Sequence, residues 1–180
     1  MPTAEPFDSV LIAARSGAEW AWARLVNGID PTLRGYVRGQ GGTDLDDLVS
    51  ETWLHVARGI HRFEGDESQF RSWVFTIAHH RIIDERRRFG RKPSEFVEDD
   101  VLDQAGPVAC SAEAEVMDRL RVEELQRVLE RLSPDQREVV TLRFIGGFTI
   151  TEIAGIMGRK PGAVQALQRR AFRRLERFLR

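Results

Sequence analysis

Two stretches near the C-terminus decide the fold of this chain: LSPDQREVV (residues 132–140) and FTITEIAGIMGRKPGAVQALQRRAFRRL (residues 148–175). Ser133 followed by Pro134 is typical of a helix start, because serine caps the first turn and proline fits there without losing a hydrogen bond. Apolar residues follow at helical spacing and give this helix a buried side. The glycine pair at 146–147 is expected to end it.

The second stretch predicts two more helices. Thr149 or Thr151 opens a short one, Gly158 supplies a tight turn, and Pro161 starts the last helix. One face of that last helix is apolar, with residues three and four apart: Val164, Leu167, Ala171 and Leu175. Its remaining surface is polar and basic, with Gln165, Gln168, Arg169, Arg170, Arg173 and Arg174. A short helix packed under a basic helix indicates a helix-turn-helix that reads the DNA major groove.

Charge is distributed in four blocks along the chain. The net charge is −5 over residues 1–70, +5 over 71–92, −8 over 93–118 and +7 over 119–180, although the whole chain carries only −1. Two basic blocks separated by an acidic one indicate two phosphate-binding surfaces, joined by a segment that DNA repels.

Length and composition favour two small domains. A chain of 180 residues with 42% apolar content can build two modest cores. We therefore predict an all-α protein, with helical domains over 1–92 and 119–180 and a flexible acidic linker over 93–118. A membrane span and a signal peptide are not apparent, so we expect a cytoplasmic protein. Cys110 is the single cysteine, which excludes an internal disulfide and argues against a cysteine-based zinc site.

The N-terminal domain is expected to be helical throughout. Amphipathic segments are predicted to break at Gly17 and at Asp30-Pro31, and the next helix to end within the glycine-rich stretch 39–42. Thr43 or Asp44 then caps another helix. Its acidic residues are most simply a solvated face near a helix N-terminus.

A polar loop over 60–69 and a long helix over 70–88 complete this domain. Aromatic and basic residues alternate along that helix. Phe70 and Trp73 are expected in the core, whereas the arginines resist burial. Stacking surfaces beside positive side chains suit single-stranded DNA.

Five short motifs carry a resemblance to a known family. They are DLVSETWL (47–54), RFEG (62–65), FRSWVFTIA (70–78), IDERRR (83–88) and the stretch 132–140, followed by the helix-turn-helix. In this order, they are similar to the bacterial RNA polymerase sigma factors of the extracytoplasmic-function (ECF) class.

The resemblance implies partners and site residues. The partners would be bacterial core RNA polymerase, promoter DNA as duplex and as melted strand, and an anti-sigma factor. The polymerase-binding residues would be Asp46, Asp47, Leu48, Ser50, Glu51 and Trp53. The minus-ten element would be bound by Arg62, Phe63, Gln69, Arg71, His79, His80, Arg81, Arg86, Arg87 and Arg88. The minus-thirty-five element would be bound by Lys160, Gln165, Gln168, Arg169, Arg170, Arg173 and Arg174. The linker would follow the RNA exit path of the polymerase.

Two other functions remain open at this point. A stand-alone helix-turn-helix regulator would explain the C-terminal motif, but neither the arginine run at 86–88 nor the acidic linker. An enzyme would need a metal held by histidines at 55, 61, 79 or 80, and their spacing does not favour one. We expect no cofactor, no metal and no catalysed reaction, and no accessory domain after Arg180.

Overall fold

The computed structural model describes residues 5–41, 44–88 and 124–178, and within these ranges the chain forms helices and no strands. The helices are α1 (Phe7–Arg15), α2 (Glu19–Gly39), α3 (Leu45–Gly59), the 3₁₀ helix η1 (Ile60–Arg62), α4 (Glu67–Arg88), α6 (Pro134–Phe144), α7 (Ile150–Ile156) and α8 (Pro161–Phe178). Residues 124–130 are also helical. This confirms the all-α prediction. The predicted linker 93–118, with Cys110, lies outside the described residues.

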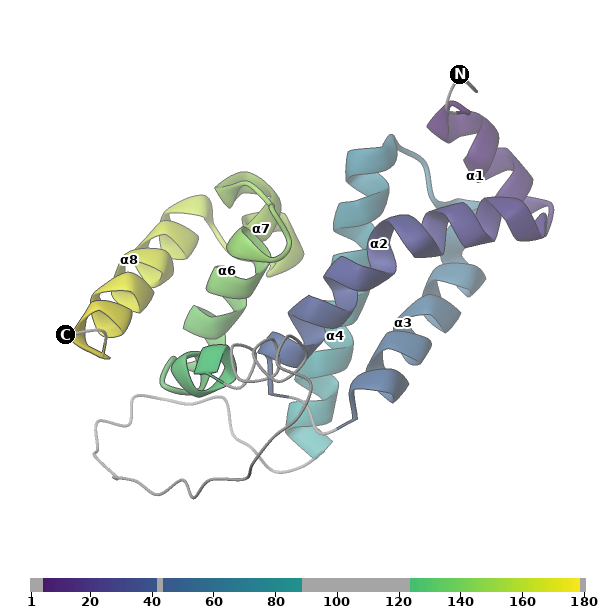
Figure 1. Cartoon of the computed structure of the whole chain (residues 1–180). Coiled ribbons are helices and arrows are strands. Elements are labelled where there is room, and N and C mark those ends of the chain that lie inside the picture. Colours follow the sequence, from purple (N-terminus) through teal and green to yellow (C-terminus); the bar gives the residue numbers. More distant parts are fainter. Residues whose placement is uncertain (1–4, 42–43, 89–123, 179–180) are drawn as a thin grey trace, which may run out of the picture.

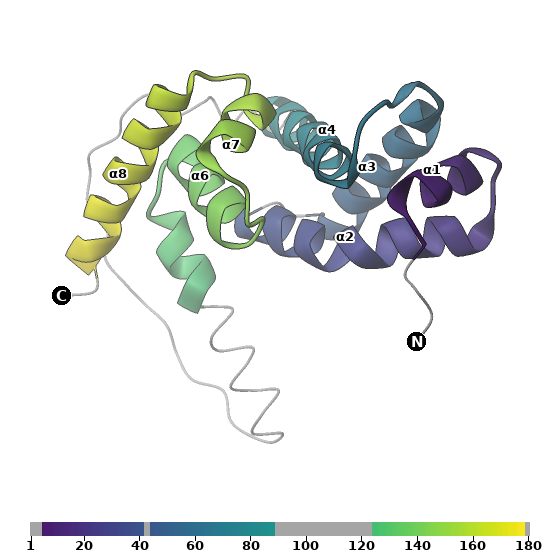
Figure 2. The ribbon, with the colours of Figure 1, turned by 90° about the horizontal axis from the view of Figure 1, so that it is seen from above.

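The helices form two groups (Figure 1). Residues 5–88, called the N-terminal unit below, contain α1 to α4, in which α1 packs on α2 and α3 packs on both α2 and α4. Residues 124–178, called the C-terminal unit, contain α6 to α8, in which α8 packs on α6 and α7. Seen from above, α6 and α7 face the N-terminal unit and α8 lies on the far side (Figure 2).

Helix α2 corrects one prediction, because it runs unbroken from Glu19 to Gly39 with Pro31 inside it. Proline removes the hydrogen bond to the carbonyl of Asn27 and costs about 3 kcal/mol in a helix interior. The apolar face of α2 continues across this point, and its members are Ala21, Leu25, Ile29, Leu33, Tyr36 and Val37, all buried. Each large buried side chain contributes about 1.5–3 kcal/mol. Packing on both sides of Pro31 therefore outweighs the lost hydrogen bond.

The other helix boundaries follow their local signals in part. Gly17 has φ 82° and separates α1 from α2, and Gly41 has φ 70° just after α2 ends. Asp44 precedes α3, but its side chain makes no capping hydrogen bond. Helix α4 begins at Glu67 rather than at residue 70, because Asp66 and Gln69 bond each other's backbone N–H groups at 2.8 and 2.9 Å. The predicted loop is correspondingly shorter.

The larger of two apolar clusters in the described residues extends through both units, and a smaller one lies within the C-terminal unit. The larger cluster includes Phe70 and Phe75 of α4, and it continues into Leu142 of α6 and Phe148 before α7. The rings of Phe75 and Phe148 meet edge to face, with centroids 4.8 Å apart. The two helical units are therefore packed against each other. Within the described ranges, none of the helices combines the length and apolarity needed to cross a bilayer.

Candidate nucleic-acid interface

Helix α8 has one buried and one open face. Val164 and Ala171 are fully buried and Leu167 is nearly so, which confirms the predicted apolar stripe. Six of the seven residues predicted to bind the minus-thirty-five element are exposed: Lys160, Gln165, Arg169, Arg170, Arg173 and Arg174. Gln168 is half-buried. The open face thus carries guanidinium groups for phosphates and guanine edges, and an amide for adenine.

Local caps begin the two helices that precede α8. Ser133 caps α6 and Thr149 caps α7, each in a capping box with the residue three positions later. The turn before α8 contains Gly158 at φ 61°. At the start of α8, Arg159 Nη2 lies 2.6 Å from Asp135 Oδ2 in the first turn of α6. The three helices of the helix-turn-helix are therefore held together at their ends as well as through their core.

The cap of α7 also perturbs an acid. The backbone N–H of Thr149 donates to Glu152 Oε2 at 2.7 Å. This hydrogen bond, with a second from the Thr149 hydroxyl, lowers the pKa of Glu152 below its usual value of 4.5. The carboxylate form is favoured in the folded protein.

Helix α3 presents an acidic face. Asp46, Asp47, Ser50 and Glu51 are exposed, whereas Leu48 is buried in the core. Trp53 is half-buried, and its Nε1 donates to Asp30 Oδ1 at 2.9 Å. Of the six residues predicted to bind polymerase, the four polar ones are therefore open to a partner. Leu48 and Trp53 instead hold α3 in place.

Asp46 is also part of a small ion-pair network. Arg34 Nη1 lies 2.5 Å from Asp46 Oδ1, and Arg34 Nε lies 2.6 Å from Asp30 Oδ2. The hydrogen bonds to Asp46 and then to Asp30 raise the pKa of Arg34 above its usual value. This arginine links the start of α3 to the middle of α2.

Hydrogen bonds from Arg15 and aromatic packing hold the segment from Ile60 to Asp66 in place. Arg15 Nε donates to the carbonyl oxygen of Ile60 at 3.1 Å, and the same guanidinium bonds the carbonyl of Phe63. The Phe63 ring stacks on Trp73 and meets Phe70 edge to face, with centroids 5.1 and 5.2 Å away. Phe63 is thus 9% exposed and shapes the segment from within.

Around Phe63, the polar members of the predicted minus-ten set lie open. Arg62 and Gln69 are exposed, and so is His80 on α4. Gln69 uses its side-chain oxygen to accept from the Asp66 N–H. The segment is therefore a rigid platform with polar groups at its surface.

Several other residues of the predicted minus-ten set contact other parts of the chain. His79 is buried, and its Nδ1 pairs with Glu138 of α6. Arg71 donates to the carbonyl of Gly146, and its guanidinium lies 4.9 Å from the ring centroid of Phe148. These three partners, Glu138, Gly146 and Phe148, all belong to the C-terminal unit.

The arginines at the C-terminal end of α4 also differ in their surroundings. Arg81 lies 2.9 Å from Asp84, and Arg86 Nη2 donates to Gln40 Oε1 at 2.7 Å. Arg87 and Arg88 are exposed. The structure thus leaves only part of the predicted cationic surface on α4 free.

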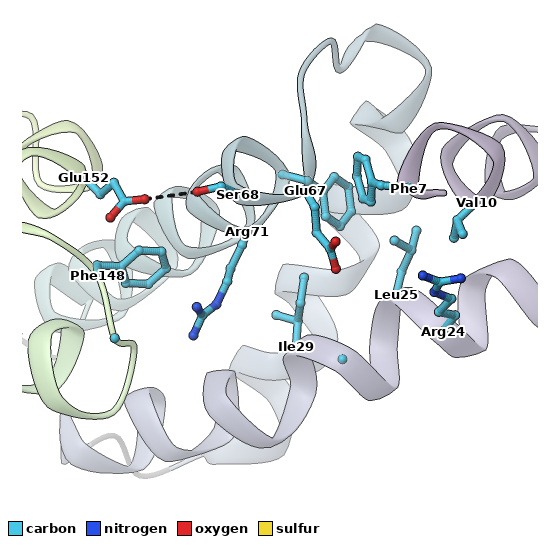
Figure 3. Close-up of a pocket in the computed structure, with 13 residues that line it drawn as sticks. Phe7, Val10, Arg24, Leu25, Ile29, Glu67, Ser68, Arg71, Phe148 and Glu152 are labelled. Atoms are coloured by element: carbon cyan, nitrogen blue, oxygen red, sulfur yellow. Dashed lines mark hydrogen bonds between the residues drawn. The ribbon is translucent and has the colours of Figure 1, made fainter. Parts of the chain in front are cut away.

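A cavity of about 660 Å³ lies where α1, α2, α4 and the turn between α6 and α7 meet (Figure 3). Its labelled lining residues are Phe7, Val10, Arg24, Leu25, Ile29, Glu67, Ser68, Arg71, Phe148 and Glu152. Ser68 Oγ donates to Glu152 Oε1 at 3.1 Å across its rim. The cavity lies between the two units, because its lining residues come from both.

Sequence patterns did not reveal three residues that organise these surfaces: Arg15, Tyr36 and Glu138. Their partners are 45 to 102 positions away in the chain, beyond the range of helical periodicity. One signal was available for Glu138, a charged residue directly before the apolar pair Val139-Val140. A lone acid at that place is expected to need a partner when the helix is buried.

The described residues contain no cluster of three His, Cys, Asp or Glu side chains able to hold a metal ion. His79 points into the protein and His80 points out, as expected for neighbours on a helix. His55 Nδ1 lies 2.9 Å from the carbonyl oxygen of Glu51, within its own helix.

Comparison with known proteins finds two regions of this chain that match family models. The family model for Sigma-70 region 2 matches residues 25–92, and that for Sigma-70, region 4 matches residues 122–175. The chain is 36% identical to the ECF RNA polymerase sigma factor BldN of Streptomyces coelicolor, over 92% of this chain and 63% of that protein. It is 30% identical to the RNA polymerase sigma factor CnrH of Cupriavidus metallidurans, over 97% of this chain and 95% of that protein.

Solved structures have the same fold. CnrH in complex with the cytosolic domain of CnrY matches with a TM-score of 0.70 at 26% identity, covering 94% of both chains. The sigma factor RpoE of Bartonella quintana, in complex with the anti-sigma factor NepR, matches with a TM-score of 0.65 at 23% identity. That match covers 88% of this chain and 96% of the RpoE chain.

Proposed function

This chain belongs to the sigma-70 family of RNA polymerase sigma factors, and we propose that it binds core polymerase, directs it to promoters and helps melt the minus-ten element. The observation that carries this proposal is the presence of both region 2 and region 4 in one chain, each on its own helical unit. A stand-alone regulator would account for the C-terminal unit alone. It is therefore not favoured.

The C-terminal unit would bind the minus-thirty-five element as duplex. Helix α8 would enter the major groove with its exposed face, since that face carries arginines and glutamines and the opposite face is buried. Arg169, Arg170, Arg173 and Arg174 would contact phosphates or guanine, and Gln165 would contact adenine. Gln168 is half-buried and would reach DNA only at the edge of this face.

The N-terminal unit would capture a melted strand at the minus-ten element. A flipped base costs a few kcal/mol to extrude, which a shaped pocket and hydrogen bonds must offset. The segment after η1 is suited to this because Arg15 bonds its backbone and the ring of Phe63 packs on Trp73, which holds the segment in place. Arg62, Gln69 and His80 lie at its surface, and Arg87 and Arg88 would hold phosphates.

Helix α3 would bind the polymerase through its acidic face. Asp47, Ser50 and Glu51 are exposed on one side of a helix whose other side is fixed in the core. Carboxylates arranged in this way suit a basic surface on a partner and speed its encounter.

Three further aspects belong to the same proposal. The chain would itself catalyse no reaction, and it would act in the cytoplasm with the transcription machinery. An anti-sigma factor would regulate it, by analogy with the RpoE–NepR complex.

Co-elution with core polymerase from the source organism tests the proposal. The wild type is expected to co-elute, and an Asp47→Ala/Glu51→Ala variant is expected to bind at least tenfold more weakly, because its acidic face is lost. Asp8→Ala/Glu19→Ala is the matched control, since these acids are exposed on α1 and α2. If the folded wild type does not bind core polymerase, the stand-alone regulator becomes the better hypothesis.

A further inference from the structure

Arg15, the last residue of α1, bonds two backbone carbonyls of the segment from Ile60 to Asp66. Its Nε donates to the carbonyl oxygen of Ile60 at 3.1 Å, and its Nη2 donates to that of Phe63. The backbone N–H of Phe63 donates to the same carbonyl of Ile60, at 3.3 Å. One guanidinium therefore joins both ends of a single turn, which suits a planar group with several donors at fixed angles.

Aromatic packing fixes the same turn through its side chains. Phe63 is 9% exposed, and its ring stacks on Trp73 with centroids 5.1 Å apart and planes 25° apart. Trp73 lies directly against Gly59, where an added Cβ would be 2.7 Å from Cζ2 of the indole. Phe70 contacts both Phe63 and Phe7, with centroids 5.2 and 5.6 Å away. Helix α1 therefore supports both the ring cluster and the backbone of the turn.

The end of the segment is fixed by α4. Gly65 has φ 150°, and an added Cβ there would lie 2.6 Å from Gln69 Oε1, so a residue with a side chain does not fit. The N–H of Asp66 donates to Gln69 Oε1 at 2.9 Å, and the N–H of Gln69 donates to Asp66 Oδ1 at 2.8 Å. The exposed side chains between the two fixed ends are those of His61, Arg62 and Glu64. Their positions relative to one another depend on the conformation of the turn.

An ordered turn distinguishes bases better than a turn that adapts to each of them. When polar groups are held at fixed positions, the wrong base leaves one of them without a partner, and that loss creates the selectivity. An adaptable surface can rearrange to accept several ligands. Contacts to phosphates carry no sequence information, so they are affected much less by such a rearrangement.

We propose that Arg15 is a positioning residue for base selection at the minus-ten element. By bonding the carbonyls of Ile60 and Phe63, it keeps the segment in the conformation that distinguishes one flipped base from the others, while Arg15 itself does not contact DNA. The inference rests on the proposed sigma function for this consequence. The bonding of the segment by Arg15 is a property of the free chain and can be tested without polymerase.

Hydrogen exchange of the free chain tests the first step. Arg15→Ala is expected to speed amide exchange in peptides covering residues 60–66 by about fivefold or more, because the turn then opens locally. Exchange in α3 should stay as in the wild type. Arg15→Lys, a milder change that keeps the charge, is expected to give an intermediate rate over residues 60–66.

Val10→Ala is the matched control for both variants. Val10 is buried on the same helix, so its truncation weakens the packing of α1 but leaves both hydrogen bonds of Arg15 in place. If residues 60–66 exchange as slowly in both Arg15 variants as in Val10→Ala, the proposal is wrong.

Selection from a pool of single-stranded oligonucleotides of random sequence tests the second step. Core polymerase from the source organism, carrying the wild-type chain, is expected to enrich one base at one position by about tenfold. With Arg15→Ala this preference should fall to about twofold or less, while the total amount of pool retained changes little because phosphate contacts remain. Val10→Ala should keep the wild-type preference. A purely structural role of Arg15 would instead lower the retention of all sequences equally.

The outcomes separate this inference from the proposed function. An unchanged base preference with Arg15→Ala would overturn the positioning role and leave the proposed function intact. If exchange is faster in the free Arg15→Ala chain but no form, the wild type included, binds core polymerase, the proposed function fails and the role in base selection fails with it. A wild-type complex that binds polymerase but enriches no base would contradict the minus-ten part of the proposed function.

Discussion

Helices α8 and α4 are both long and basic, yet the structure places their cations in opposite environments. On α8, Arg169, Arg170, Arg173 and Arg174 all lie at the surface. On α4, Arg71 and His79 contact the C-terminal unit, and Arg86 binds Gln40 of α2. Similar compositions therefore do not imply similar readiness to bind DNA. The face of α8 proposed to bind duplex DNA is open, whereas the residues of α4 proposed to bind the melted strand are partly occupied by other groups of the protein.

The largest expected effect is on α8. Arg169→Glu/Arg170→Glu is expected to reduce promoter-directed transcription at least a hundredfold, because it replaces two attractive charges by two repulsive ones at the groove. Binding to core polymerase, measured by co-elution, should be unchanged.

Arg38→Glu/Arg58→Glu is the control, since both arginines are exposed on other helices. Retained transcription in the α8 variant, or an equal loss in the control, would contradict the assignment of the open face.

A smaller effect on DNA affinity should distinguish the exposed Arg174 from Arg86, which is hydrogen-bonded within the protein. Arg174→Ala is expected to weaken binding of the free protein to a mixed-sequence duplex roughly threefold and to lower the slope of log affinity against log salt by about 1. Arg86→Ala is expected to change neither, because its guanidinium is bonded to Gln40. Fluorescence anisotropy across a salt series measures both. A slope reduced equally by Arg86→Ala would show that the hydrogen bond to Gln40 does not keep Arg86 from DNA.

The smallest expected effect concerns the cap where α7 meets α4. The lowered pKa of Glu152 means that its carboxylate stabilises the fold above about pH 4.5, and that this contribution is lost as pH falls through the lowered pKa. Because Glu152 is largely solvated, the contribution is below about 1 kcal/mol. Glu152→Gln should lower the free energy of unfolding by that amount at pH 7 and by progressively less as the pH falls below 4.5, measured by urea denaturation. Glu176→Gln, which replaces an exposed acid on α8, is the matched control.

Local signals in the sequence predicted the helix-turn-helix well. Ser133 and Thr149 form the capping boxes, Gly158 forms the turn, and the stripe through Val164 lies in the core. These features depend on residues within one or two helical turns, which is the range over which periodicity and capping act. The predicted break at Asp30-Pro31 was wrong because long-range packing along α2 overrides a local helix breaker.

The junction between the units could not be predicted in this way. Tyr36 and Glu138 are 102 residues apart, and His79 and Glu138 are 59 apart. A histidine on a basic helix is compatible both with DNA contact and with burial against an acid, and only the fold distinguishes them. The individual roles proposed for residues at both promoter elements stay predictions, because they depend on DNA and polymerase as well as on this chain.

The hold of Arg15 on the segment after α3 has a consequence for where the functional N-terminal unit begins. The region 2 match starts at residue 25, so α1 and its guanidinium lie outside it. Yet Arg15 bonds the backbone carbonyls of Ile60 and Phe63. The ring of Phe7, on the same helix, packs on that of Phe70 with centroids 5.6 Å apart. The N-terminal unit is therefore longer than the region 2 match. A chain trimmed to residues 25–92 would keep every residue proposed to touch the melted strand, but it would lose the contacts of Arg15 and Phe7 that support them.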